Sequence, residues 1–251
     1  MSGHSKWSTI KHGKAVTDAR RGKLFTKLTK EVIIAVRESG PNPETNFRLR
    51  LAMQKAKDSN MPSTNVERAI KRANGDDSDG ARTEEVTYEG YGPGGTAILL
   101  QALTDNRNRT VSDVRSTFTK LGGNLAEAGA VSWQFEQKGL IVVESNGDSE
   151  DLTLVAIEAG ADDFETIDTS LHAYSLPGEL ENLRKALTDY GAEVTSTELT
   201  MLPINTVPLD DKTAKKALNL LDQLEELDDT QKVYSNADFT DEVLTTYGNE
   251  S

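Results

Sequence analysis

The residues with the clearest chemical potential are Lys and Arg side chains crowded into the first thirty positions, where Asp18 is the single acid. Trp7 stands among them, with a histidine on either side. Lysine and arginine neutralise phosphates and release counterions, and an exposed aromatic ring can stack on an unpaired base. The segment therefore predicts a surface that binds a nucleic-acid backbone. Its candidate contacts are His4, Lys6, Trp7, Lys11, His12, Lys14, Arg20, Arg21, Lys23, Lys27 and Lys30.

Two readings of Trp7 stay open at this point. The ring either stacks on a base or anchors the basic arm in a protein core, and the second role would still leave the cations exposed. Five further cations are secondary candidates for phosphate contacts: Arg68, Lys71, Arg72, Arg107 and Arg109. For the last two, which follow Asp105 at a predicted helix start, ion pairing within the chain is the favoured interpretation.

The net charge of the chain is unevenly divided. The 251 residues carry a formal net charge of −13, yet residues 1–75 hold sixteen Lys/Arg and six Asp/Glu, a net charge of +10. Residues 76–251 hold the remaining −23. Such asymmetry is typical of a basic module that meets polyanions and is carried on an acidic body. The boundary falls in the Asp- and Gly-rich stretch 76–80, which is typical of a linker.

Several function classes have no support in the sequence. The chain has no cysteine and three histidines, so thiol catalysis, Cys-ligated zinc and most His-based metal sites are excluded, and no cofactor is predicted. The glycine run 90–95 lacks the Gly-Lys-Ser/Thr of a phosphate loop and is expected to be a hairpin turn. No motif nominates a catalytic site, so an enzyme is not predicted. No apolar run could span a membrane, and a cytoplasmic location without a membrane partner is expected.

Hydrophobic periodicity predicts three helices in the basic segment, the first from an apolar stripe that includes Leu28, Val32 and Val36. They cover residues 18–39, 44–58 and 64–75, with Phe47, Leu51 and Met53 buried in the second. Thr64 and Glu67 have capping-box spacing at the start of the third helix. The short turn between the last two helices is compatible with a helix-turn-helix arrangement.

The rest of the chain alternates strands and helices. Strands are expected at 85–89, 96–103, 131–136 and 140–144, with a helix from about Val111 to Leu121 and a turn at Lys138–Gly139. Thr110 and Asp113 are expected to form a capping box for that helix. Residues 140–203 follow the order β-α-β-β-α-β, which is the ferredoxin-like pattern. A last helix carries Leu218, Leu221 and Leu224, a strand follows at 232–235, and the tail from Thr245 is expected to be frayed.

The predicted fold class is α+β and multidomain. A three-helix bundle is followed by two α/β domains, one of them ferredoxin-like and inserted in the other. The expected domain bounds are 1–75 for the basic bundle, 81–137 plus 206–240 for the middle domain, and 138–205 for the inserted domain.

Six motifs resemble the YebC family, in order along nearly the whole chain. They are GHSKW (3–7), DARRGKLFTKL (18–28), YEGYGPGG (88–95), TDNRNRT (104–110), GGN (122–124) and LDQLEELDDTQKVYSN (221–236). The resemblance implies three domains and a regulator of gene expression without enzymatic activity. Some members are described as DNA-binding transcriptional regulators. Similar proteins, among them the mitochondrial translational activator of cytochrome c oxidase, act on ribosomes and ease synthesis through proline-rich stretches. GHSKW begins at Gly3, which leaves no room for an organellar leader and favours a bacterial cytoplasm.

The residues and the resemblance together predict a non-catalytic regulator that binds nucleic acid through its basic helical module. The target is DNA, with the third helix towards the major groove, or ribosomal RNA, with the arm reaching into folded RNA on the ribosome. A third hypothesis is an acidic scaffold, in which the body docks a basic protein and the arm is intramolecular glue.

Overall fold

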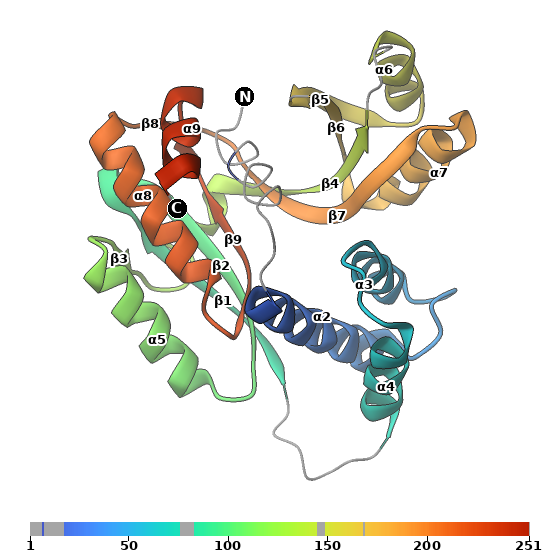
Figure 1. Cartoon of the computed structure of the whole chain (residues 1–251), viewed down its shortest axis with the longest axis horizontal. Coiled ribbons are helices and arrows are strands. Elements are labelled where there is room, and N and C mark those ends of the chain that lie inside the picture. Colours follow the sequence, from blue (N-terminus) through green and yellow to red (C-terminus); the bar gives the residue numbers. More distant parts are fainter. Residues whose placement is uncertain (1–6, 8–17, 76–82, 145–148, 168, 251) are drawn as a thin grey trace.

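The computed structural model describes residue 7 and residues 18–75, 83–144, 149–167 and 169–250. Its helices and antiparallel sheets form the predicted α+β fold, with a helical N-terminal region and two α/β units (Figure 1). Helix α2 lies between the sheet of the first α/β unit and the pair formed by α3 and α4.

The helical region consists of α2 (Asp18–Ser39), α3 (Phe47–Asp58) and α4 (Ser63–Asn74). Helix α3 begins three residues later than predicted, because the side chain of Asn46 accepts a hydrogen bond from the Leu49 N–H and caps the helix there. The same buried amide donates to the carbonyls of Ala35 and Gly40, which fixes the turn between α2 and α3. The predicted Thr64 capping box is wrong, since α4 starts after Pro62 without a side-chain cap.

The two faces of α3 pack against different parts of the molecule. Leu49, Ala52 and Ala56 are buried in the bundle core with α2 and α4, and Met53 packs at its margin. Phe47, Leu51 and Met53 were expected to be buried, but all three are only half-buried, and Phe47 and Leu51 pack against the core of the second α/β unit. Helix α3 therefore joins the bundle to the inserted sheet.

The first α/β unit is built on a four-stranded antiparallel sheet in the order β3-β1-β2-β9. Strands β1 and β2 form a hairpin whose Pro93–Gly95 turn packs against helix α8, and Gly94 has φ +76, a conformation that favours glycine. Strand β9 pairs with β2, so the C-terminal part of the chain completes this sheet. The bounds are β1 Glu84–Tyr91, β2 Ala97–Thr104, α5 Arg107–Lys120, β3 Asn124–Leu125, α8 Asp211–Glu225 and β9 Thr230–Ser235.

Helices α5 and α8 cover one face of this sheet. Ile98 and Leu100 of β2 meet Phe118 of α5 and Leu221 of α8 in a buried cluster, and Trp7 belongs to the same cluster. Helix α5 starts at Arg107 under a cap from Asn106, so the capping box predicted at Thr110 is wrong.

The second sheet has the order β5-β6-β4-β7, and helices α6 and α7 contribute to its core. This order, with both crossovers made by helices, is the ferredoxin-like topology that the sequence predicted. The bounds are β4 Phe135–Glu144, α6 Ser149–Glu158, β5 Ala161–Ile167, β6 Ser170–Ser175, the 3-10 turn Pro177–Glu179, α7 Leu180–Tyr190 and β7 Glu193–Pro203.

Strand β4 corrects the prediction of two strands with a turn at Lys138–Gly139. The strand is continuous, and Gly139 is needed for close packing, since a Cβ there would lie 2.9 Å from the Leu180 side chain. The preceding Ser132–Gln134 is a 3-10 turn, and Trp133 is 70% exposed. Because β4 runs across position 138, the domain bounds 1–75, 81–137 plus 206–240 and 138–205 stay a proposal.

The C-terminal segment is helical to Glu250, where a frayed tail was expected from Thr245. Helix α9 (Asp241–Glu250) buries Val243 and Leu244 in the cluster shared with α8, and the Tyr247 hydroxyl donates to Asp222. A short parallel pair, β8 (Val207–Pro208) with β10 (Ala237–Asp238), precedes it.

One carboxylate joins all three parts of the molecule. Glu198 of β7 lies 3.1 Å from the Lys55 Nζ of α3 and 3.0 Å from the Lys232 Nζ of β9. Burial alone would raise the pKa of Glu198, but the two ammonium groups outweigh it and lower that pKa well below its usual range.

Candidate nucleic-acid interface

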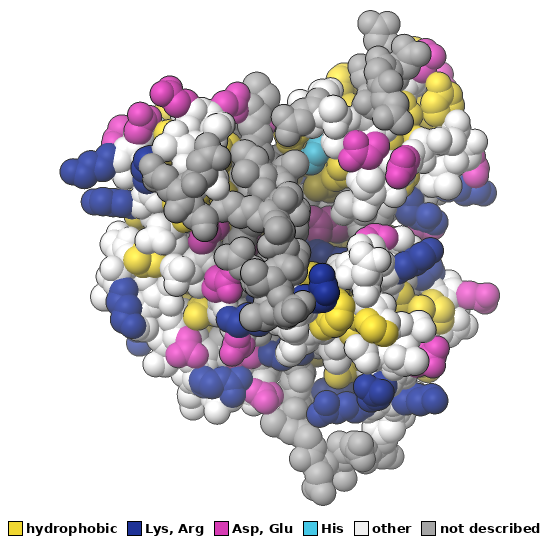
Figure 2. Space-filling model, viewed as in Figure 1, with side chains coloured by type: hydrophobic (Ala, Val, Ile, Leu, Met, Phe, Trp, Pro, Cys, Tyr) yellow, Lys and Arg dark blue, Asp and Glu magenta, His cyan; other side chains and the backbone are white. Residues whose placement is uncertain are grey.

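Charge is unevenly distributed over the described surface. Figure 2 shows Lys and Arg side chains gathered over α4, at the lower right of the view. The cations of the helical region fall into two groups, those that contact carboxylates or carbonyls elsewhere in the chain and those that face solvent.

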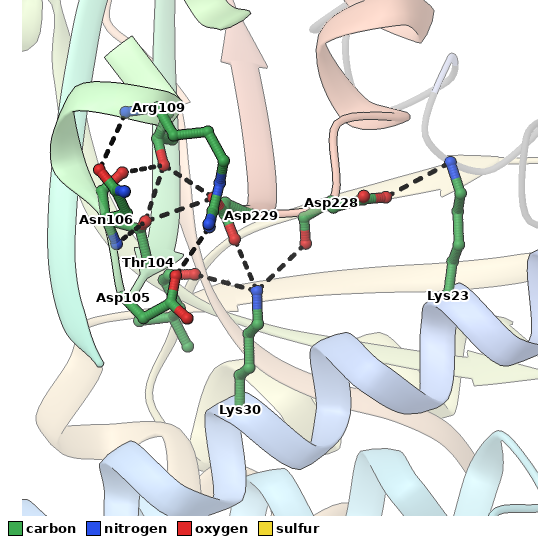
Figure 3. A network of polar contacts seen from close by, with 10 residues as sticks. Lys23, Lys30, Thr104, Asp105, Asn106, Arg109, Asp228 and Asp229 are labelled. Carbon is green, nitrogen blue, oxygen red and sulfur yellow. Dashed lines mark hydrogen bonds and ion pairs between the residues drawn. The ribbon is translucent and has the colours of Figure 1, made fainter. Parts of the chain in front are cut away.

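Three lysines on one face of α2 belong to the paired group. Their partners lie at the end of α8 and in the loop that follows it (Figure 3). Lys23 Nζ is 3.5 Å from an Asp228 carboxylate oxygen, and Lys27 Nζ donates to the Glu225 carbonyl at 2.6 Å. Lys30 Nζ is 2.7 Å from Asp229 Oδ1. The carbonyl end of a helix carries partial negative charge, which adds to the attraction of these carboxylates.

Asp229 is the centre of this contact. Its Oδ2 accepts hydrogen bonds from Arg109 Nη2 at 2.8 Å and from the Thr110 hydroxyl at 2.7 Å, while Oδ1 accepts from Lys30. Burial would raise the pKa of Asp229, but these hydrogen bonds outweigh it and lower the pKa to about 2. The carboxylate therefore stays charged and joins α2 to α5 and to the end of β2, where Thr104 also contacts it.

The structure therefore assigns an intramolecular role to part of the predicted basic arm. Lys23, Lys27 and Lys30 contact the chain's own carboxylates and carbonyls, as the scaffold hypothesis expects of intramolecular glue. Trp7 is 3% exposed, so it is a core anchor in this conformation and cannot stack on a base. The anchor point is the core of the middle unit. Arg21 is exposed at the start of the described part of α2. His4, Lys6, Lys11, His12, Lys14 and the side chain of Arg20 lie outside the described residues.

The secondary candidates on α5 are also paired. Arg107 Nε lies 3.4 Å from Glu84, and Arg109 binds both Asp105 and Asp229. The interpretation of these arginines as internal ion-pair partners agrees with this geometry, and a free phosphate site does not.

The secondary candidates on α4 differ. Arg68, Lys71 and Arg72 are exposed, and within the described part of the chain no carboxylate lies at ion-pair distance from them. Arg68 donates to the Asn65 side chain at 3.4 Å, which leaves most of its guanidinium donors to solvent. The apolar residues Val66 and Ala69 turn inward, so the helix presents its cations outward.

Two further exposed cations of the bundle, Arg37 and Lys57, have the same character. Arg37 was not singled out from the sequence, although it falls outside the apolar stripe of Leu28, Val32 and Val36 that predicted α2. The apolar stripe that predicted the helix therefore also indicated that the Arg37 side chain is exposed.

The described residues contain neither a candidate metal site nor a candidate membrane span. No group of three His, Asp or Glu side chains there could hold a metal ion. No helix among these residues combines the length and the apolarity needed to span a bilayer.

Comparisons with known proteins place the chain in a family. Residues 5–76 match the model of the TACO1/YebC N-terminal domain, and residues 83–237 match the model of the TACO1/YebC second and third domains. A probable transcriptional regulatory protein of Dehalococcoides mccartyi (strain CBDB1) is 54% identical over 252 residues and covers 100% of both chains. Another, from Chloroflexus aggregans, is 52% identical over 248 residues and covers 97% of this chain and 98% of its own length.

The fold has a counterpart among solved structures. A conserved hypothetical protein from Aquifex aeolicus superposes with a TM-score of 0.86 at 48% identity, covering 94% of this chain and 97% of that one. Two family models match in sequence order, and the two relatives are matched over at least 98% of their length, so this chain belongs to the TACO1/YebC family.

Proposed function

We propose that the chain is a non-enzymatic regulator of gene expression that binds the phosphate backbone of nucleic acid through its helical module. The relatives named as transcriptional regulatory proteins support duplex DNA as the first target. One structural observation carries the proposal: Arg68, Lys71 and Arg72 face solvent together on one helix, whereas the lysines of α2 contact carboxylates and carbonyls of the same chain.

The chemistry of this surface favours backbone contacts over base readout. Lys and Arg bind phosphate without sequence information, and base recognition needs side chains such as Asn, Gln or Arg held against base edges. The exposed face of α4 offers three such side chains, Arg68, Arg72 and Asn74, and the two arginines are the groups assigned to phosphate, so weak intrinsic specificity is expected. The same cations fit the phosphates of ribosomal RNA, which makes an RNA-binding translation factor the second candidate.

The test is a binding titration of the full chain with a labelled 25-base-pair DNA duplex and with a ribosomal RNA fragment. The triple variant R68A/K71A/R72A removes three phosphate contacts, and the slope of log affinity against log salt should fall by about 2.7, or 0.9 per contact. The matched control is R115A/K120A/K216A, which removes three exposed cations from α5 and α8 and should leave the slope close to that of the wild type.

The titrations distinguish DNA from RNA as the target, and they also test whether α4 is the binding surface. Tighter binding of the DNA duplex than of RNA at about 0.15 M salt supports the transcriptional proposal, and the reverse preference supports the translational one. Equal losses in the test and control triples would show that α4 is not the interface.

A further inference from the structure

The free edge of the ferredoxin-like sheet combines acidic charge with exposed apolar side chains. Between Lys138 and Arg184 the sequence holds eleven Asp/Glu and neither Lys nor Arg. The flanking cations are not available to this region, because Lys138 pairs with Asp162 and Arg184 pairs with Glu181. Among the described residues, Asp151, Glu158 and Asp163 of this region lie in no ion pair, so their negative charge is uncompensated.

Three apolar side chains are exposed in the same region. Leu154 and Ile157 of α6 are 58% and 49% exposed, and Phe164 of β5 is 45% exposed. Leu154 and Ile157 lie three positions apart and share the outer face of α6, since Leu152 and Ala156 fill the inner one. Over α6, at the upper right, Figure 2 shows hydrophobic and acidic side chains at the surface.

We call this surface the acidic edge patch. It comprises the apolar residues Leu154, Ile157 and Phe164 and the exposed acids Asp151, Glu158 and Asp163. Large apolar side chains rimmed by one sign of charge mark surfaces that bind a partner of the opposite charge.

The backbone of β5 adds a second binding element. Strand β5 pairs with β6 on one side, and among the described residues no strand pairs with its other side. Natural edge strands are protected by charged side chains, proline, bulges or a covering segment. The protecting charges of β5 (ADDFETI) are acidic and do not repel a basic strand, and its bulge between Ala161 and Asp163 leaves residues 164–167 regularly paired with β6. The Phe164 N–H already donates to Asp163 Oδ1 at 2.8 Å, so an added strand would pair with the remaining outer backbone groups of β5.

We propose that the acidic edge patch binds an extended, Lys/Arg-rich segment of another protein, which adds as a strand to β5. Aliphatic side chains of that segment would cover Leu154, Ile157 and Phe164, and its cations would pair with Asp151, Glu158 and Asp163. The negative charge of the patch repels nucleic acid and anionic membranes, so a basic protein is the partner that fits. This interaction is separate from the phosphate contacts of α4.

The probe is a fluorescein-labelled peptide of twelve residues in which Lys and Val alternate, titrated with the full chain at about 0.15 M salt. L154S should weaken binding by about fivefold or more, because it removes apolar contact without changing charge. The matched control is I204S, which alters a side chain equally exposed at 58% but located after β7, at the opposite edge of the sheet. Its affinity should stay within about twofold of the wild type.

Two further arms test the charge and the strand addition. The double variant E158Q/D163N should weaken binding and reduce its salt dependence. A peptide N-methylated at alternate residues, which cannot complete the backbone ladder, should lose at least about tenfold in affinity.

Three outcomes would overturn the proposal. Equal weakening by L154S and I204S would reduce the interaction to general charge attraction. Unchanged affinity of the N-methylated peptide would exclude strand addition. Self-association of the wild type that L154S abolishes would make a second copy of this chain the occupant.

Discussion

Helices α2 and α4 both carry clustered cations, yet their environments are opposite. The lysines of α2 contact the acidic segment 225–229, some two hundred residues later in the chain, while the cations of α4 face solvent. A positive charge run in the sequence therefore has two meanings, and the position of the complementary acids decides between them. Here the lysines of α2 stabilise the fold, and the cations of α4 are available to a polyanion.

The largest expected effect tests whether the arm is anchored. Trp7→Ala should lower the free energy of unfolding by about 3–5 kcal/mol, because it removes a buried indole from the core formed by α5 and α8. Chemical denaturation measures this change. Trp133→Ala is the control, since that indole is 70% exposed, and it should cost far less. Similar small effects of both variants would mean that Trp7 does not pack in this core in solution.

The next largest effect tests the contact between α2 and the acidic segment. Asp229→Asn should lower the free energy of unfolding by about 3 kcal/mol, since it leaves Lys30 without its charged partner inside a hydrogen-bonded network. Asp228→Asn is the matched control, because the Asp228 side chain is 82% exposed and should contribute less than about 1 kcal/mol. If Asp229→Asn left stability unchanged but increased DNA affinity, the α2 lysines would belong to the nucleic-acid surface.

A smaller effect follows from the acid titration of the same carboxylate. The pKa of Asp229 is about 2 in the folded chain, against an ordinary value of 3.8, so its ionised form stabilises the fold. This contribution is complete above about pH 4 and is lost as the pH falls through 2, an expected loss of about 2 kcal/mol. Denaturation midpoints of the wild type and Asp229→Asn should therefore converge over this range. Parallel curves would assign the acid sensitivity to other groups.

The sequence predicted the elements that follow from local patterns. The apolar stripe that includes Leu28 and Val32 predicted helix α2, and the order of strands and helices in 140–203 predicted the ferredoxin-like unit. Local signals failed where packing decides the outcome. Gly139 indicated a turn, but it lies within β4 because Leu180 leaves no space for a side chain. Thr110 indicated a helix cap, but it lies within α5 and its hydroxyl donates to the Asp229 carboxylate.

The candidate site was harder to predict than the fold, for the same reason. Lys30 and Arg72 are equivalent as sequence positions, since each is a cation in a basic helix. They differ only because α2 packs against residues 225–229 and α4 does not, and that contact depends on the tertiary fold. The acids of LDQLEELDDTQKVYSN were visible in the sequence, but nothing local paired them with α2.

The smallest expected effect concerns the arginines at the start of α5. Arg107→Ala removes a single ion pair between Arg107, whose side chain is 63% exposed, and Glu84, whose side chain is 45% exposed. It should therefore change the free energy of unfolding by less than about 0.5 kcal/mol. Arg109→Ala should destabilise the fold more, because it also removes a hydrogen bond to the buried carboxylate of Asp229. DNA affinity should stay close to that of the wild type in both variants. A several-fold loss of affinity in Arg107→Ala alone, with stability unchanged, would extend the nucleic-acid surface from α4 to α5, because exposed pairs exchange an internal carboxylate for a phosphate at little cost.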